Sequence, residues 1–272
     1  MAGLVMAFQK LDLQKGLLSS PWVGFDNFKY LFSSSDAWVI TRNTVCYNVV
    51  FILMNMVFSV FLAVVFNELR SKWFAKVSQT VIIMPYFLSA VVVSSIVFAF
   101  LSPMDGFVNS LLERYDTAPI KWYTERSVWP YILVFLYLWQ NVGYSSILYS
   151  AALSGIPGEY YEAAMIDGAT KFQQFRYITL PHLRFVMCIN LIRGIGRIFK
   201  SGLGLFYTIP RDSGALFSVT NVLDTYVYRG LMTSGDIGKS AAAGFYQSVV
   251  GLILVLIANK IISKIDSDSA MF

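Results

Sequence analysis

One apolar stretch of the sequence, residues 129–153, carries polar and aromatic side chains that could bind a hydroxylated solute. Its polar residues recur at positions i, i+3, i+4 and i+7, which share one face of a helix: Tyr137, Gln140, Asn141 and Tyr144. Amides offer paired donors and acceptors to hydroxyl groups, and aromatic rings can stack on the apolar faces of sugars. Ordinary hydrogen bonding between helices would use the same residue types. We favour a substrate pathway because four such residues share one stripe.

A second apolar stretch, residues 185–206, contains three cations. Arg193, Arg197 and Lys200 would share a helix face there, with Ser201 beside them. An unpaired charge at the centre of a bilayer costs at least about 2.5 kcal/mol, so these cations should face water, a partner or a substrate. The carboxylates nearest in the sequence, Asp212 and Asp224, lie in the loop that follows. An acidic oligosaccharide would explain the cations, and so would pairing of the arginines with another protein subunit.

Catalytic and metal-binding patterns are missing from the sequence. It has no paired carboxylates, no Ser-His-Asp set and no Cys-His set, and its one histidine, His182, has no second histidine or cysteine pair nearby. Gly238-Lys239-Ser240 resembles part of a phosphate-binding loop, but Thr233 stands where that motif needs glycine. We therefore predict neither an enzyme nor a metal site, and we expect this chain to bind no cofactor.

The composition predicts a membrane protein. Of the 272 residues, 56% are hydrophobic and only 14% are charged, whereas soluble domains carry about 25% charged residues. Apolar residues gather in the stretches 44–67, 80–101, 129–153, 185–206 and 240–262. Each is long enough for a helix to cross a hydrocarbon core of about 30 Å. We predict an all-α, polytopic helical bundle with five transmembrane helices, the second kinked at Pro85.

The net charge of +5 does not predict a nucleic-acid partner. The sequence contains no basic run, and lipid headgroups and membrane topology explain a modest excess of Lys and Arg.

The polar loop 154–184 carries a short predicted helix. Pro157 favours a helix start, Gly168 can end that helix, and Thr170 can cap another. The face formed by Tyr161, Ala164, Met165 and Gly168 is small enough to enter a groove on a partner protein, with Tyr161 and Met165 as anchors. An amphipathic helix lying on lipid is the alternative, but such helices are usually rich in Lys and Arg, and 158–169 contains none.

The same loop carries a specific motif. Glu162-Ala163-Ala164, then Gly168, then Ile178-Thr179-Leu180-Pro181 resembles the cytoplasmic signature loop of permeases from type I binding-protein-dependent ABC importers. Residues 21–32, residues 223–229 with 240–259, and the terminal Ala270-Met271-Phe272 look like sugar permeases of the oligosaccharide and polysaccharide subfamily.

This resemblance implies a multi-pass protein of the bacterial plasma membrane that forms half of a sugar translocation pathway. Its partners would be a second permease subunit, a dimer of ATP-binding cassette ATPases that holds ATP and Mg, an extracytoplasmic solute-binding protein, the sugar and membrane lipid. ATP-driven closure of the ATPases would move the docked helices and switch the spans from inward-facing to outward-facing. The resemblance assigns ATPase coupling to Tyr161, Glu162, Ala163, Ala164, Met165, Gly168, Ile178, Leu180 and Pro181, with Pro181 stopping the loop where the next span begins.

Family members carry one more helix before the segment that begins near Met1. We therefore expect an extracytoplasmic or interfacial segment (1–43) after a missing first helix, a transmembrane domain (44–264) with the cytoplasmic coupling loop 154–184, and a cytoplasmic tail (265–272). A secondary transporter is the alternative function. It would need intramembrane Asp or Glu and an internal repeat, and the five apolar stretches contain no acidic residue. A membrane-embedded enzyme is disfavoured by the missing catalytic groups.

Overall fold

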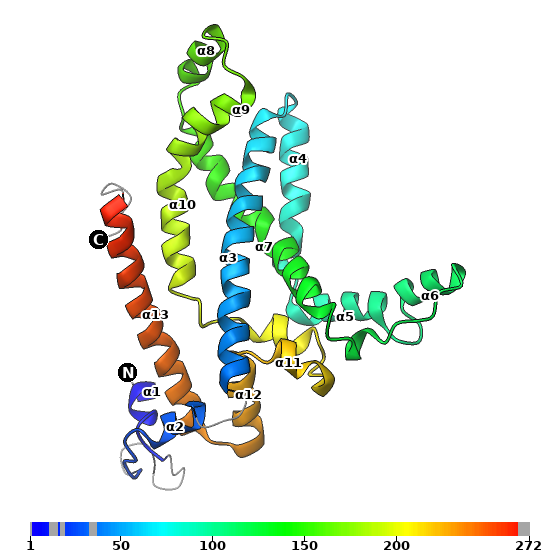
Figure 1. Cartoon of the computed structure of the whole chain (residues 1–272), viewed down its shortest axis with the longest axis vertical. Helices are drawn as coiled ribbons and strands as arrows, with labels where there is room; N and C mark the ends of the chain where they lie inside the picture. Colours follow the sequence, from blue (N-terminus) through cyan, green and yellow to red (C-terminus); the bar gives the residue numbers. More distant parts are fainter. Residues whose placement is uncertain (1, 11–15, 17–19, 33–36, 266–272) are drawn as a thin grey trace. The chain divides into compact units, whose positions relative to one another are not determined.

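The chain is helical in the computed structural model, which describes residues 2–10, 16, 20–32 and 37–265. These residues form no strand, and Gln9 and Trp22 make an isolated bridge. The predicted all-α class is confirmed. Residues 266–272 of the expected tail, with the match at Ala270-Met271-Phe272, lie outside the described residues. The helices (Figure 1) are α1 (Ala2–Met6), α2 (Asp26–Phe32), α3 (Ala37–Glu68), α4 (Lys72–Ile83), α5 (Ala90–Leu101), α6 (Phe107–Arg114), α7 (Trp129–Ser154), α8 (Gly158–Ile166), α9 (Lys171–Gln174), α10 (Leu180–Ile195), α11 (Phe217–Thr220), α12 (Leu223–Ser234) and α13 (Ile237–Ile265).

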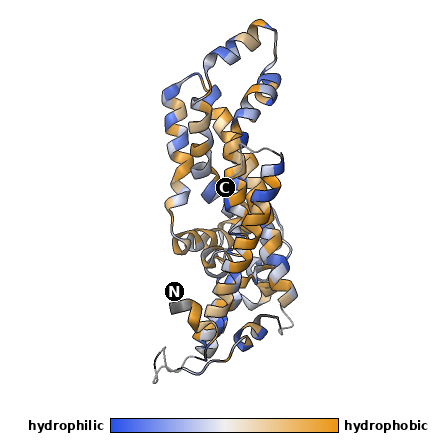
Figure 2. Ribbon diagram, turned by 90° about the vertical axis from the view of Figure 1, so that its left-hand side faces the viewer, coloured by the Kyte–Doolittle hydropathy of each residue, from blue (hydrophilic) through white to orange (hydrophobic). Residues whose placement is uncertain are grey.

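Four helical segments in the described part of the chain are long and apolar enough to cross a membrane. They are α3, α7, Lys171–Ile195 and α13, and the bent pair formed by Lys72–Phe87 and α5 would be a fifth. Hydrophobic residues predominate along these helices, and hydrophilic residues gather toward the loops (Figure 2). The spans predicted at 44–67, 129–153 and 240–262 are confirmed, with between one and eight more helical residues in total at the ends of each.

The second predicted span is broken rather than kinked. The helix α4 ends at Ile83, a 3₁₀ turn covers Met84–Phe87, and α5 begins at Ala90. Pro85 has no N–H to continue the helix, and the hydroxyl of Ser89 accepts from Val92 N–H at 3.3 Å to cap α5. The break therefore follows from proline at one end and a capping serine at the other.

The boundaries predicted for the fourth span, 185–206, are wrong. The helix runs from Lys171 to Ile195, and Pro181 lies inside it rather than stopping the loop. A π-helical turn over Phe175–Thr179, closed by the Leu180 N–H bonding to the Phe175 carbonyl, precedes the proline. This wider turn accommodates Pro181, which has no N–H and would crowd a regular α-helical turn.

The described chain divides into two compact units, each with its own core. One unit comprises Met1–Val49, Ser89–Val134 and Gly196–Leu254, and the other Val50–Leu88, Phe135–Ile195 and Val255–Phe272. The first core is built from Ile40, Ile198, Phe199, Leu223 and Ala243. The second is built from Val60, Ala63, Tyr149, Leu153 and Leu183.

Within the second unit, glycine and small polar residues allow the helices to approach closely. A Cβ added at Gly143 of α7 would lie 2.2 Å from the Ile82 carbonyl oxygen of α4. On the side facing α3, the Asn55 amide donates to the Ser145 hydroxyl at 3.0 Å. Such contacts bind helices together where lipid offers no hydrophobic driving force.

Candidate functional site: the exposed α8 helix and the polar faces of the spans

The loop between α7 and α10 holds the short helix that the sequence predicts. Pro157 directly precedes α8, and the helix contains no buried residue. Gly168 adopts a left-handed φ of 77° just after the helix ends. Thr170 and Gln173 then form a capping box that starts α9. The helix boundary at Gly168 and the cap at Thr170 are therefore confirmed.

One face of α8 packs against its own chain. The Tyr161 hydroxyl lies 2.9 Å from the Thr179 hydroxyl, and the rings of Tyr160 and His182 are 5.6 Å apart. Tyr161 and Ala164 are half-buried. Of the face that the sequence predicts for docking, Tyr161 and Ala164 thus lie toward their own chain, whereas Met165 and Gly168 are exposed.

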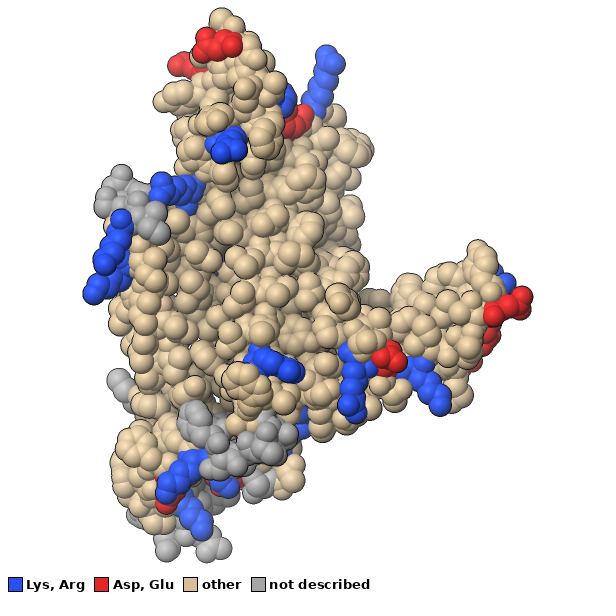
Figure 3. Space-filling view, in the orientation of Figure 1, with Lys and Arg blue, Asp and Glu red and all other residues tan. Residues whose placement is uncertain are grey.

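The opposite face of α8 is the exposed one. Its residues are spaced i, i+3, i+4 and i+7: Glu159, Glu162, Ala163 and Ile166. Ile166 is 87% exposed and the neighbouring Met165 is 56% exposed. Acidic side chains gather at the tip that α8 forms (Figure 3). We call Glu159, Glu162, Ala163 and Ile166 the α8 outer face. Glu159 and Ile166 were missed by the sequence analysis, although their spacing from Glu162 and Ala163 marks them.

The remaining motif residues lie under α8 rather than on it. Ile178 is half-buried in the π-helical turn, and its carbonyl lies 2.6 Å from His182 Nδ1. Leu180 and Pro181 line an apolar hollow of about 430 Å³ together with Met187. Ile178 and Leu180 are half-buried and Pro181 is exposed, whereas every residue of the α8 outer face is exposed.

The polar stripe on α7 is confirmed as a stripe, and its members meet other residues of their own unit. The Tyr137 ring stacks on Phe51 with centroids 3.9 Å apart, and the Asn141 amide donates to the carbonyl of Tyr137 at 2.8 Å. The Gln140 amide reaches the Leu88 carbonyl at the break between α4 and α5 at 3.5 Å.

At the same break, the Tyr144 ring stacks on Tyr86 with centroids 4.2 Å apart. Both rings remain about two-fifths exposed, and the adjacent Phe87 is 76% exposed. The stripe therefore serves interhelical packing and also presents aromatic surface beside a broken helix.

The three cations predicted on one helix face are not on one helix. Because α10 ends at Ile195, Arg193 lies in its last turn, whereas Arg197 and Lys200 lie in the segment that follows. All three side chains are exposed. Among the described residues, none of the ion pairs involves them.

The Asp224 carboxylate binds the chain segment that follows α10. Its carboxylate accepts the backbone N–H groups of Ser201 at 2.7 Å and Gly202 at 2.9 Å. It also accepts from the Gln247 amide at 2.7 Å, and the Ser201 hydroxyl accepts from Asn48 at 2.8 Å. Asp224 therefore holds this segment in place, and Ser201 has a structural role here.

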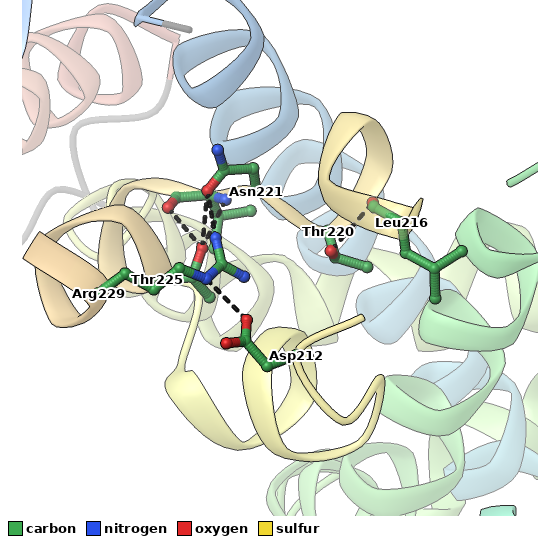
Figure 4. A network of polar contacts seen from close by, with 7 residues as sticks. Asp212, Leu216, Thr220, Asn221, Thr225 and Arg229 are labelled. Carbon is green, nitrogen blue, oxygen red and sulfur yellow. Dashed lines mark hydrogen bonds and ion pairs between the residues drawn. The ribbon is translucent and has the colours of Figure 1, made fainter. Parts of the chain in front are cut away.

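Asp212 is occupied as well, in a network with Arg229 and Asn221 (Figure 4). The Arg229 guanidinium donates to Asp212 at 2.7 Å and to the Asn221 side-chain oxygen at 2.8 Å. It also lies 3.9 Å from the ring centroid of Phe217. Neither carboxylate is thus available to the three cations.

Comparison with known proteins agrees with this architecture. Residues 44–267 match the family model of the binding-protein-dependent transport system inner membrane component. Protein LplB of Bacillus subtilis (strain 168) is 34% identical over 98% of this chain and 84% of its own length. The polygalacturonan/rhamnogalacturonan transport system permease protein YteP of the same organism is 33% identical over 97% of this chain and 82% of its own length.

A solved structure has the same fold. A chain in the crystal structure of a bacterial ABC transporter involved in the import of the acidic polysaccharide alginate superposes with a TM-score of 0.86 and 31% identity, over 97% of this chain and 88% of that one. The alginate transporter in complex with an alginate pentasaccharide-bound periplasmic protein gives a TM-score of 0.84 at 31% identity, over 97% of this chain and 87% of that one.

The contacts of Asp224 give a test of the segment after α10. We expect Asp224→Ala to speed amide hydrogen exchange at Ser201 and Gly202, with a loss of about 1–3 kcal/mol in opening free energy, because the two backbone donors lose a charged acceptor. Hydrogen-exchange mass spectrometry measures this. Asp105→Ala, at an exposed carboxylate in the same unit, should leave the exchange unchanged. Equal exchange in the two variants would contradict this role for Asp224.

Proposed function

Because the chain belongs to the family of inner membrane components of binding-protein-dependent transport systems, we propose that it is the permease subunit of an ATP-driven importer of acidic oligosaccharides. The observation that carries the ATP-driven part is the α8 outer face. The short helix α8 lies on a loop between two spans and contains no buried residue. Its side chains Glu159, Glu162, Ala163 and Ile166 are all exposed.

This face has the properties of a docking surface. Ile166 supplies an apolar anchor and Ala163 leaves room for a close approach, while the two glutamates would pair with cations at the rim of a groove. Tyr161 fixes the rotation of α8 through its contact with Thr179. A pull on α8 would therefore reach α10 through this contact, as coupling to an ATPase requires. ATP and Mg would be held by the ATPase dimer, and this chain would bind no cofactor.

The proposed substrate class comes from the cations and the relatives. Arg193, Arg197 and Lys200 are exposed and make none of the ion pairs among the described residues. If they line the sugar pathway, these cations would bind the carboxylates of acidic sugars through charge-assisted hydrogen bonds. YteP is named for polygalacturonan and rhamnogalacturonan, and the structurally similar transporter is involved in the import of the acidic polysaccharide alginate. Tyr137, Gln140, Asn141 and Tyr144 would supply hydrogen bonds and stacking surfaces for sugar rings.

The remaining partners are part of the same proposal. A second permease subunit would complete the pathway, and an extracytoplasmic solute-binding protein would deliver the sugar. The structure that contains an alginate-bound periplasmic protein supports such a delivery step.

The docking role of α8 is tested by Ile166→Asp. We expect it to reduce the amount of ATPase that co-purifies and the ATP-dependent uptake by at least about tenfold, a loss of about 1.4 kcal/mol, because a charge replaces the apolar anchor. Tyr161→Phe is the matched control on the inner face of the same helix. It removes only the hydroxyl that contacts Thr179, so it should retain the co-purifying ATPase but lower uptake, because that contact carries the movement of α8 to α10. Normal co-purification and uptake with Ile166→Asp would overturn the docking proposal.

The substrate class is tested by Arg193→Gln and Arg197→Gln. Each should lower the uptake of labelled uronic-acid oligosaccharides by roughly tenfold, because a charge-assisted contact is lost. Uptake of neutral oligosaccharides should stay unchanged. The control is Arg70→Gln, at an exposed cation between α3 and α4. An equal loss for both substrates, or no loss, would contradict the acidic class while leaving the importer function in place.

A further inference from the structure

The helix α6 presents an apolar stripe to its surroundings. Its members are Met104, Phe107, Leu111 and Tyr115, exposed by 84%, 61%, 43% and 76%. They are spaced by three or four residues, which places them on one side of the helix and its flanks. We call them the α6 stripe. Large apolar residues gathered in this way on a surface mark an interaction site.

The opposite side of α6 is fixed by Asn109, so the stripe cannot turn inward. Asn109 is fully buried, and its amide donates to the Ile120 carbonyl at 3.0 Å. Its side-chain oxygen accepts from the Ile120 N–H at 3.1 Å and from Trp122 Nε1 at 2.9 Å. Asn109 lies about 160° around the helix from Leu111. This clamp keeps the α6 stripe pointing outward.

The α6 stripe continues the apolar surface of the preceding helix, α5. On α5, Val92, Ile96 and Phe100 are exposed at four-residue spacing, and the ring of Phe100 meets the ring of Phe107 with centroids 5.6 Å apart. The two helices follow each other directly (Figure 1). Leu101 and Phe107 are six residues apart, so the chain cannot separate them by more than about 20 Å. The stripe therefore begins close to the end of α5, a helix that is itself apolar enough to contact lipid.

We propose that α6 lies in the membrane–water interface with its stripe in contact with lipid. Interfacial helices bury their apolar face about 5–10 Å deep, at the boundary between headgroups and acyl chains. Arg114 follows Leu111 by three residues and Phe107 by seven, so it shares the stripe's side and can reach lipid phosphates. It is the sole Lys or Arg of residues 102–120. Tyr115 has an amphipathic ring of the kind that is enriched at membrane–water interfaces.

The experiment places a fluorescent label on each side of α6 in the complete importer, reconstituted in nanodiscs with brominated phosphatidylcholine. With Cys46 and Cys188 replaced by serine, Leu111→Cys carries a bimane label on the stripe, and Glu113→Cys carries it on the opposite, exposed side. Bromine on the acyl chains should quench the label at 111 several-fold more strongly than the label at 113. Phe107→Cys should behave like Leu111→Cys.

Equal quenching at 111 and 113 would overturn the proposal, because it would mean that the helix does not lie with one side in the lipid. An unquenched, blue-shifted label at 111 would also overturn it and would show that another protein subunit covers the stripe. An unquenched, red-shifted label would show that the stripe faces water. The readout uses neither ATP nor sugar, so its failure is distinct from failure of the proposed transport function.

Discussion

Hydrocarbon cannot hydrogen-bond to a peptide group, and this constraint governs the structure. Within a membrane each N–H and C=O must find a partner inside the protein, so helices span it and every interruption of a helix needs a substitute partner. The Ser89 hydroxyl caps the start of α5 after the break at Pro85. Beyond the end of α10, the Asp224 carboxylate accepts the backbone donors of Ser201 and Gly202.

Candidate functional residues lie beside these interruptions. The break between α4 and α5 exposes Tyr86 beside Tyr144, and the Leu88 carbonyl is reached by Gln140. The π-helical turn before Pro181 lies under the exposed α8, where Thr179 meets Tyr161. In a regular helix the Leu88 carbonyl would bond within its own helix and would not be open to Gln140. Departures from regular helix thus supply both the candidate sugar contacts and the candidate link to an ATPase.

Much of the fold could be predicted from the sequence because long apolar stretches have few alternatives in a membrane. The capping role of Thr170 and the left-handed Gly168 also followed from local chemistry. The start of the fourth span could not be predicted, because a proline such as Pro181 normally marks the start of a helix. The π-helical turn that accommodates Pro181 leaves no clear pattern in the sequence. The shared face of Arg193 and Arg197 was wrong because it assumed a helix that continues past Ile195.

The sequence also could not show which side chains contact each other when they are far apart in the chain. The spacing of α8 showed which residues share a face, but whether that face points outward depends on the contact between Tyr161 and Thr179, eighteen residues apart. Likewise, residue types alone could not show that Asp212 binds Arg229 or that Asp224 accepts the amides of Ser201 and Gly202. The choice of partner depends on tertiary structure, which residue types and spacing alone do not encode.

The most direct measurement is transport in proteoliposomes that contain this chain with the proposed second permease and ATPase dimer. The proposed solute-binding protein and a labelled uronic-acid oligosaccharide are supplied outside, and ATP is enclosed. We predict uptake that requires ATP hydrolysis and the binding protein and that persists when ion gradients are collapsed. Uptake that continues without ATP and stops when an ion gradient is removed would contradict the account, since it would make the protein a secondary transporter.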